Sequence, residues 1–184
     1  MNSNRPNEVL STKITGTLTP LHIACCNGRR STLKLLINYG ADIKVKNNNG
    51  EIPFFFFTCK YTPFYWTAEM LIKNNANPFT KDNENDSVLY SYSKHIATCE
   101  DYMNRLKILV FLLKIGFDIN ETNKDGRTPL MELCCFDESY PVYYYIRHGS
   151  NIYIKDRDGN TTLSIAQSLN NKKVEKYLIE HGAL

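Results

Sequence analysis

The 184-residue sequence has little net charge and no long apolar stretch. Lys and Arg number 22 and Asp and Glu number 19, which leaves a formal net charge of +3. This balance does not predict binding to nucleic acid or to an acidic membrane surface, because both require clustered cationic side chains. No apolar stretch approaches the roughly 18 residues of a membrane-spanning helix. The segment from Met1 to Lys13 is polar and unlike a secretory signal, so we expect a cytoplasmic protein.

Motifs for catalysis and metal binding are also missing from the sequence. It contains no glycine-rich phosphate loop, no serine nucleophile elbow and no His-Glu-x-x-His motif. The six cysteines lack the Cys-x-x-Cys spacing that is typical of zinc sites. Cys25–Cys26 and Cys134–Cys135 recur at matching positions, which predicts small apolar residues packed between repeated units. We therefore expect no enzyme activity, no cofactor and no metal.

What the sequence does contain is an internal repeat. In three segments, a residue that marks the register of the repeat is followed by an apolar stretch and then by a glycine. The spacing from this register mark to the glycine is the same in all three segments, for example from Pro20 to Gly40. Two degenerate copies lie between these segments, and insertions lengthen the second and third steps from mark to mark. A period of about 33 residues, which the first and last steps have, is typical of stacked helical units. The five marks are Pro20, Pro53, Val88, Pro129 and Thr162.

Residues typical of helix ends recur in the same register. Thr19 and Thr128 stand where a helix N-cap is expected. The prolines that follow them, Pro20 and Pro129, suit the first helical position because no intrahelical bond needs their missing N–H group. Each unit is too small to bury its own apolar face, so we expect neighbouring units to stack. The glycines expected to end helices are Gly40, Gly116, Gly149 and Gly182.

This period and these motifs resemble the ankyrin repeat over nearly the whole chain. The resemblance implies an all-α repeat solenoid of about five units, each with two antiparallel helices and a hairpin tip, with degenerate middle repeats. It also implies that His22 is structural and forms hydrogen bonds to neighbouring loops. We predict a lead-in of residues 1–13 and a single repeat domain of residues 14–184. The predicted repeats are approximately residues 14–46, 47–81, 82–122, 123–155 and 156–184.

The resemblance further implies that the hairpin tips and the adjacent first helices form a concave protein-binding face. The tips carry charges of both signs, which favours a protein partner over a phosphate backbone. The candidate binding residues in the tips are Lys46, Asn48, Lys81, Asn83, Lys124, Asp125, Arg157 and Asp158.

Two aromatic clusters leave alternatives open. Residues 54–57 are four consecutive phenylalanines, which cannot share one helix face, so we predict a helix buried on several sides. The aromatics that follow either fill a loop or anchor a partner, since Tyr and Trp dominate binding hot spots. Tyr143, Tyr144 and Tyr145 replace the usual aliphatic second helix, so we expect core packing with one ring at the surface. The candidate anchors are Tyr61, Phe64, Tyr65 and Trp66.

The chain resembles orthopoxvirus-type ankyrin proteins in two respects. It is rich in Asn, Ile, Lys and Tyr, and the sequence motifs of residues 17–24 and 36–43 are similar to those of that family. That family implies host-range and immune-evasion work in the infected cell, where a host protein is captured. Many members deliver it to a cullin ubiquitin ligase through a C-terminal F-box-like segment. Because the sequence ends with the fifth repeat, we expect neither that segment nor a cullin partner. Two alternatives remain: a short member that captures or blocks a host protein, or a truncated remnant of a longer adaptor with little function of its own.

Overall fold

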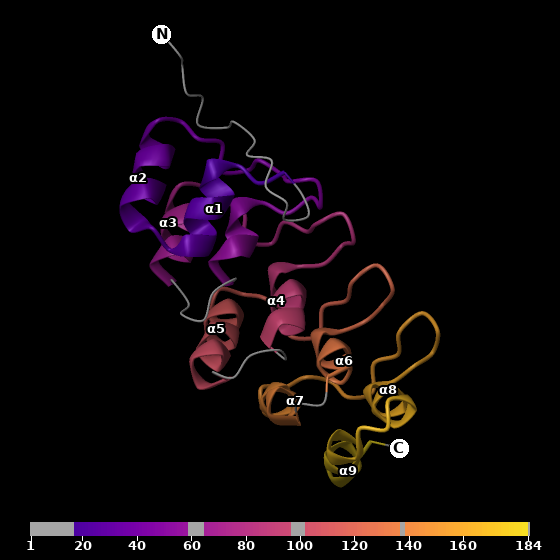
Figure 1. The fold of residues 1–184 in the computed structure, drawn as a ribbon. Helices are drawn as coiled ribbons and strands as arrows, with labels where there is room; N and C mark the ends of the chain where they lie inside the picture. Colours follow the sequence, from indigo (N-terminus) through magenta and orange to yellow (C-terminus); the bar gives the residue numbers. More distant parts are fainter. Residues whose placement is uncertain (1–16, 59–64, 97–101, 137–138, 184) are drawn as a thin grey trace. The chain divides into compact units, whose positions relative to one another are not determined.

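The computed structural model describes residues 17–58, 65–96, 102–136 and 139–183, which are coloured along the chain in Figure 1. These residues form helices and turns and contain no extended strand, apart from an isolated bridge residue at Leu18. The chain divides into two compact units, Met1–Val88 and Leu89–Leu184. The division falls within the third predicted repeat.

The first unit holds three α-helices and one 3-10 helix among its described residues. These are α1 (Pro20–Asn27), α2 (Arg30–Asn38), η1 (Pro53–Thr58) and α3 (Tyr65–Lys73). The two helices of the first repeat, α1 and α2, pack against each other, and η1 packs against α3. Helix α1 also packs against η1, so the first helical segments of successive repeats stack within this unit.

The four phenylalanines of the second repeat lie in η1, which is a 3-10 helix rather than an α-helix. Phe54, Phe55 and Phe57 are at most 4% exposed. Phe56 is half-buried, and its ring lies edge-on to His22 with centroids 5.1 Å apart. The prediction that this segment is buried on several sides is confirmed. The tighter 3-10 turn places successive rings about 120° apart, which distributes them around the axis.

The second unit begins at Leu89 and contains all of α4 except its first residue, Val88. Its helices show the pairwise stacking of a repeat solenoid (Figure 1): α6 packs against α7 and α8, while α7 packs against α5 and α9. First helices therefore stack on first helices and second helices on second helices. The described helices are α4 (Val88–Ile96), α5 (Tyr102–Lys114), α6 (Pro129–Leu133), α7 (Ser139–Arg147), α8 (Thr162–Ser168) and α9 (Lys172–Glu180).

A threonine stands at the N-cap of three first helices, α1, α6 and α8. Thr128 and Thr161 accept hydrogen bonds at Oγ1 from the N–H groups of Met131 and Ser164, at 3.3 and 3.2 Å. Each bond pairs an amide that the helix itself leaves without a partner. Thr19 precedes α1 in the same extended conformation, and Pro20 and Pro129 occupy the first turns of their helices.

The second helices end in one backbone pattern, even in a degenerate repeat. Gly149 takes a φ of +94°, and the next amide, of Ser150, donates to the carbonyl of Tyr145 at 3.1 Å. In the second repeat Asn75 replaces the glycine with a φ of +66°, and the amide of Ala76 donates to Leu71 at 2.9 Å. Asparagine tolerates this left-handed conformation better than most residues, so the repeat keeps its geometry without glycine.

Each unit has its own apolar core. In the first unit Leu21, Leu33 and Leu71 are completely buried. In the second unit Leu130 and Leu178 are completely buried as well. Removing each such side chain from water contributes about 1.5–3 kcal/mol to folding, which stabilises units built from short repeats.

Candidate protein-binding surface

Four hairpin tips share one local structure, built on an Asn or Asp three residues before the turn residue. In the first tip, Asn47 Oδ1 accepts from the amides of Asn49 and Glu51 at 3.0 and 2.9 Å. The amide of Asn47 in turn donates to the carbonyl of Glu51 at 3.0 Å. Short Asn and Asp side chains favour such turns because they reach the backbone two residues further on.

The same bonds recur in the other three tips. Asp82, Asn123 and Asp156 each accept from the amides two and four residues later, at distances of 2.8–3.0 Å. Each also donates its own amide to the carbonyl four residues later. The tips are therefore rigid elements of the backbone. In the third, degenerate repeat Asn85 takes a φ of +60° where the other tips have a glycine.

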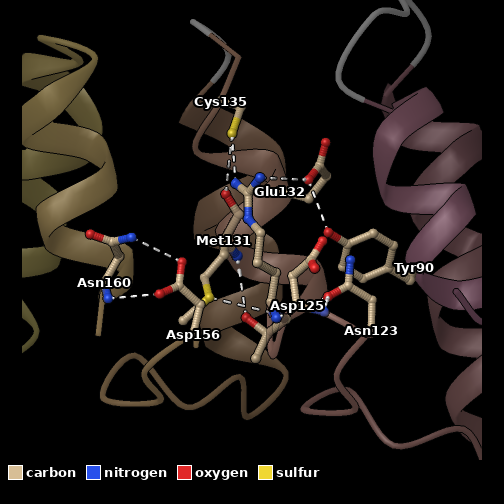
Figure 2. A network of polar contacts seen from close by, with 10 residues as sticks. Tyr90, Asn123, Asp125, Met131, Glu132, Cys135, Asp156 and Asn160 are labelled. Atoms are coloured by element: carbon tan, nitrogen blue, oxygen red, sulfur yellow. Dashed lines mark hydrogen bonds and ion pairs between the residues drawn. The ribbon is translucent and has the colours of Figure 1, made fainter. Parts of the chain in front are cut away.

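Ionisation strengthens the last of these tips. Burial by itself raises the pKa of the Asp156 carboxyl, but hydrogen bonds from Asn160 and Asp158 outweigh it and hold that pKa below its ordinary value. The carboxylate form accepts three bonds, because the Asn160 side chain also donates to Oδ2 at 3.1 Å. Figure 2 shows Asp156 and Asn160 facing each other across this tip.

Neighbouring tips are joined by hydrogen bonds within each unit. In the first unit the Asn83 amide donates to the Asn49 carbonyl, and Asn83 Nδ2 donates to the Asn48 carbonyl, both at 2.9 Å. In the second unit the Arg157 amide donates to the Asp125 carbonyl at 2.9 Å. The structure thus brings together candidate residues that the sequence predicted separately, Asn48 with Asn83 and Asp125 with Arg157.

The charged side chains of the predicted tip residues point to solvent or lie partly exposed. Lys46, Lys124 and Asp125 are exposed, and Lys81 is half-buried. Arg157 and Asp158, on the last tip, are also exposed. Their backbones are held by the tip bonds, while their side chains of opposite sign remain accessible to another molecule.

A polar network joins a tip to two first helices in the second unit. Figure 2 shows Tyr90 of α4 beside Glu132 of α6, and Tyr90 Oη donates to Glu132 Oε2 at 3.0 Å. The Arg127 guanidinium lies 3.6 Å from the same carboxylate oxygen and donates to Cys135 Sγ at 3.0 Å. Sequence reasoning missed Tyr90, Arg127 and Glu132. Their only signal was the position of Arg127 directly after the tip glycine.

His22 joins the first helix to the following tip. Its Nδ1 accepts from the amide of Thr19 at 3.1 Å, which leaves the proton on Nε2. That Nε2–H group donates to the carbonyl of Glu51 at 3.1 Å. Burial lowers the pKa of His22, which outweighs the opposing effect of Glu51. A neutral ring therefore connects two repeats.

The predicted aromatic anchors separate into two groups. Tyr61 and Phe64 lie outside the described residues. Tyr65 and Trp66 are half-buried at the start of α3, a second helix, so they do not belong to the tips or first helices. The guanidinium carbon of Arg30 lies 5.8 Å from the Trp66 ring centroid, within the range of a cation–π contact.

The paired cysteines differ from the expectation that all are packed between units. Cys25 and Cys134 are completely buried, and burial raises the pKa of each thiol. Cys26 is half-buried and Cys135 is exposed. The second cysteine of each pair is one residue, about 100°, further around the helical turn, which takes it away from the neighbouring repeat.

The described ranges contain no group of three or more His, Cys, Asp or Glu residues placed to hold a metal ion. Among the helices of those ranges, none has the length and apolar character that a bilayer crossing requires. In each unit, two rigid polar tips with exposed side chains of both charge signs form the candidate site. Such a surface is suited to contact with a folded protein, where charges of opposite sign determine orientation and specificity.

Comparisons with known proteins agree with this architecture. The sequence model for "Ankyrin repeats (3 copies)" matches residues 94–184, and that for "Ankyrin repeat" matches residues 18–48. The chain is 26% identical to palmitoyltransferase AKR1 of Lachancea kluyveri over 89% of this chain and 21% of that protein. It is 30% identical to a putative ankyrin repeat protein of Rickettsia bellii, over 88% of this chain and 21% of that one.

Viral relatives match over a similar extent. Ankyrin repeat protein B18 of Variola virus is 26% identical, over 88% of this chain and 32% of that protein. The chain thus spans between about a fifth and a third of the curated relatives described here. Proteins built from these repeats are typically non-catalytic modules for protein interaction. With its register, its stacked helix pairs and its hairpin tips, the chain belongs to the ankyrin repeat family and has homologues among orthopoxvirus ankyrin proteins.

Proposed function

We propose that the chain captures another protein with the hairpin tips and the first helices beside them. The observation that carries the proposal is the common structure of the tips, in which an Asn or Asp side chain fixes the backbone at both ends of the turn. A surface already rigid before binding loses little conformational entropy on association. Exposed Lys124, Asp125, Arg157 and Asp158 provide charges of both signs to orient a partner.

The partner in this proposal is a host protein, and the chain acts as a viral host-range or immune-evasion factor that blocks it in the cytoplasm of the infected cell. The similarity to Variola and Vaccinia virus ankyrin proteins supports the viral context. The mixed charge of the tips favours a protein surface over a nucleic acid backbone, which presents one sign only.

Charge reversal on the tips tests the proposal. The tagged chain and a Lys124→Glu/Arg157→Glu variant are used to isolate partners from infected-cell lysate, with chemical cross-linking to locate the contact. Lys34→Glu/Lys114→Glu is the matched control, because these lysines are also exposed but lie on second helices. We expect at least a tenfold loss of one stoichiometric partner in the tip variant and none in the control. Equal recovery with both variants contradicts the proposal.

A second candidate function stays open because the chain spans only part of its relatives. The same repeats would suit the target-binding part of a longer adaptor for a cullin-type ubiquitin ligase. The isolation described above distinguishes the two. Recovery of cullin components together with the host protein supports the adaptor, and a host partner without them supports simple sequestration.

A further inference from the structure

The outer face of the second unit carries an aromatic groove that lies apart from the hairpin tips. It runs between the second helices α7 and α9, which pack side by side (Figure 1). The hollow measures about 370 Å³. That is near the lower end of the roughly 300–1,000 Å³ typical of ligand pockets, so it suits a short stretch of chain. Its lining residues are Tyr140, Tyr143, Tyr144, Arg147, Tyr177 and His181.

The rings of the groove form an ordered stack. Tyr143 of α7 lies 4.0 Å from Tyr177 of α9 between ring centroids, and Tyr177 lies 4.0 Å from His181. A second stack on α7 places Tyr144 and His148 4.1 Å apart at an interplanar angle of 28°. The groove is therefore built from rings that support each other before any ligand is bound.

The two histidines are fixed by hydrogen bonds to their own helices. His148 Nδ1 and His181 Nδ1 each lie 2.8 Å from the carbonyl four residues earlier, that of Tyr144 and Tyr177 respectively. Because a carbonyl only accepts, Nδ1 must carry the proton in both rings. This bond holds each imidazole against its tyrosine, which adds to the rigidity of the stacks.

The stacking residues occupy an outward position of the repeat. Tyr144 and Tyr177 both lie five residues before the helix-ending glycine, and His148 and His181 lie directly before it. In the first repeat these positions hold Leu35 and Tyr39, which are 57% and 74% exposed. Tyr145, in contrast, is completely buried, with its hydroxyl 2.9 Å from Ser93 Oγ. Only Tyr145 of the three consecutive tyrosines is thus a core residue, whereas the sequence predicted one surface ring.

The charge of the groove indicates what it can bind. Arg147 is exposed, and among the described lining residues it alone has a permanent charge. No carboxylate of the described ranges lines the hollow, and nearby Glu180 faces Lys176, with Nζ and Oε1 3.9 Å apart. A ligand with a negative charge beside an apolar, ring-binding part is therefore complementary to it.

We propose that this groove binds an extended proline-containing segment of a protein, with an acidic residue of that segment opposite Arg147. Proline-rich segments adopt the polyproline II conformation before binding and dock into grooves lined by aromatic rings. The tyrosine rings supply that lining, and the Arg147 guanidinium pairs with carboxylates in a fixed fork geometry. The groove provides a second interaction surface, on a different face from the tips.

Three labelled decapeptides test this chemistry by fluorescence anisotropy with the full chain. One is built from Glu-Pro-Pro repeats, one from Lys-Pro-Pro repeats and one from Glu-Ser-Ser repeats. The first keeps both features, the second reverses the charge, and the third removes the proline rings. We expect at least about tenfold tighter binding of the Glu-Pro-Pro peptide than of either of the others, which corresponds to one well-formed contact.

Two variants locate the binding. Tyr177→Leu preserves the apolar character of a half-buried residue but removes the ring between Tyr143 and His181, and it should weaken Glu-Pro-Pro binding about tenfold. Arg147→Glu alters an exposed residue, so the fold is retained, and it should reverse the preference in favour of Lys-Pro-Pro. Tyr39→Ser, at an exposed tyrosine of the first unit, is the matched control and should leave binding unchanged.

Several results would overturn the proposal. It is wrong if the three peptides bind equally, if Arg147→Glu leaves the peptide preference as it was, or if Tyr39→Ser weakens binding as much as Tyr177→Leu. It is also wrong if an oligothymidine binds the groove residues in preference to the peptide, or if sedimentation shows a dimer of the wild-type chain that Tyr177→Leu dissociates. The proposal for the tips is unaffected by these results, because no tip residue is changed.

Discussion

At the scale of the residue, His22 shows how one side chain depends on both local and distant structure. Its position after the Thr-Pro-Leu motif places Nδ1 next to the amide of Thr19, three residues away. The acceptor of its Nε2–H group, the Glu51 carbonyl, is 29 residues away and belongs to the next repeat. The ring is completely buried and must stay neutral to accept at one nitrogen and donate at the other.

We predict that acid destabilises the fold through His22. Its pKa in the folded chain lies below the ordinary value of 6.5, so the unfolded chain takes up the proton first. The stabilisation that the neutral His22 ring provides is complete above about pH 6.5. As the pH falls below that value, the free energy of unfolding decreases by at most about 1.4 kcal/mol per pH unit. Urea unfolding at several pH values measures it.

The control for this prediction is a comparison of how the stability of two variants depends on pH. His22→Gln removes the titration and should flatten the pH dependence between about pH 7 and 5, at the cost of lower stability at neutral pH. His181→Gln changes an exposed histidine and should retain the wild-type slope. An identical slope for His22→Gln and the wild type would contradict the assignment.

At the scale of the element, the hairpin tip is the unit that recurs most regularly. Its Asn or Asp, its turn residue and its reciprocal backbone bonds lie close together in the sequence. Local chemistry of this kind is open to sequence reasoning, because turn-forming residues act on their own backbone. The contact between one tip and the next cannot be predicted in this way, since Asn83 and Asn48 are 35 residues apart in the sequence.

Glycine substitutions separate the contribution of the local turn to stability from that of the contact between neighbouring tips. Gly50 and Gly159 have nearly the same φ, +80° and +81°, but an added Cβ at Gly50 comes within 2.7 Å of the Asn83 amide nitrogen. A Cβ added at Gly159 comes within 4 Å of no atom of the described residues beyond Gly159 and its two chain neighbours. We expect Gly159→Ala to lose about 1–2 kcal/mol from backbone strain alone. Gly50→Ala should lose a further 1–3 kcal/mol, roughly, because the next tip must move.

The midpoints of urea unfolding measure both variants. Gly126→Ala provides an intermediate case, because its Cβ would lie 3.1 Å from the Arg157 amide nitrogen. The expected order of stability loss, from smallest to largest, is therefore Gly159→Ala, then Gly126→Ala, then Gly50→Ala. Equal losses in all three would mean that the tips do not support each other.

At the scale of the whole molecule, stability comes from contacts between neighbouring repeats. First helices contact the first helix of a neighbour, as α6 contacts α8, and second helices do the same, as α7 contacts α9. In such a chain the free energy of unfolding is approximately a sum of repeat and neighbour terms. Damage to one repeat should therefore remain local.

We predict that core truncations act on the repeat that carries them. Leu178→Ala in α9 and Leu33→Ala in α2 each remove a completely buried side chain and should cost about 2–5 kcal/mol. Hydrogen exchange followed by mass spectrometry should show faster exchange in α8 and α9 for Leu178→Ala, with α1 and α2 little changed. Leu33→Ala should show the opposite distribution. A uniform rise along the chain in either variant would contradict this additive behaviour.

The candidate site was partly predictable from the sequence, because the tips are local structures. The tip residues Lys124, Asp125, Arg157 and Asp158 follow from the register, because polar residues next to a turn residue stay at the surface. The network of Arg127, Glu132 and Tyr90 did not follow, since it joins residues up to 42 positions apart through side chains alone. Periodicity likewise could not distinguish buried Cys134 from exposed Cys135, which are adjacent in the sequence.

By itself, the sequence determined the repeat, its step, the helix ends and the polar turns, since each depends on bonds between residues a few positions apart. Even degenerate repeats kept this structure, with Asn75 and Asn85 in the left-handed conformation that glycine takes elsewhere. Only the tertiary structure decided which tyrosines are core and which form the groove between α7 and α9. The reason is that burial depends on how one repeat lies against the next, and the helical period specifies a face of the helix but not the side chains that cover it.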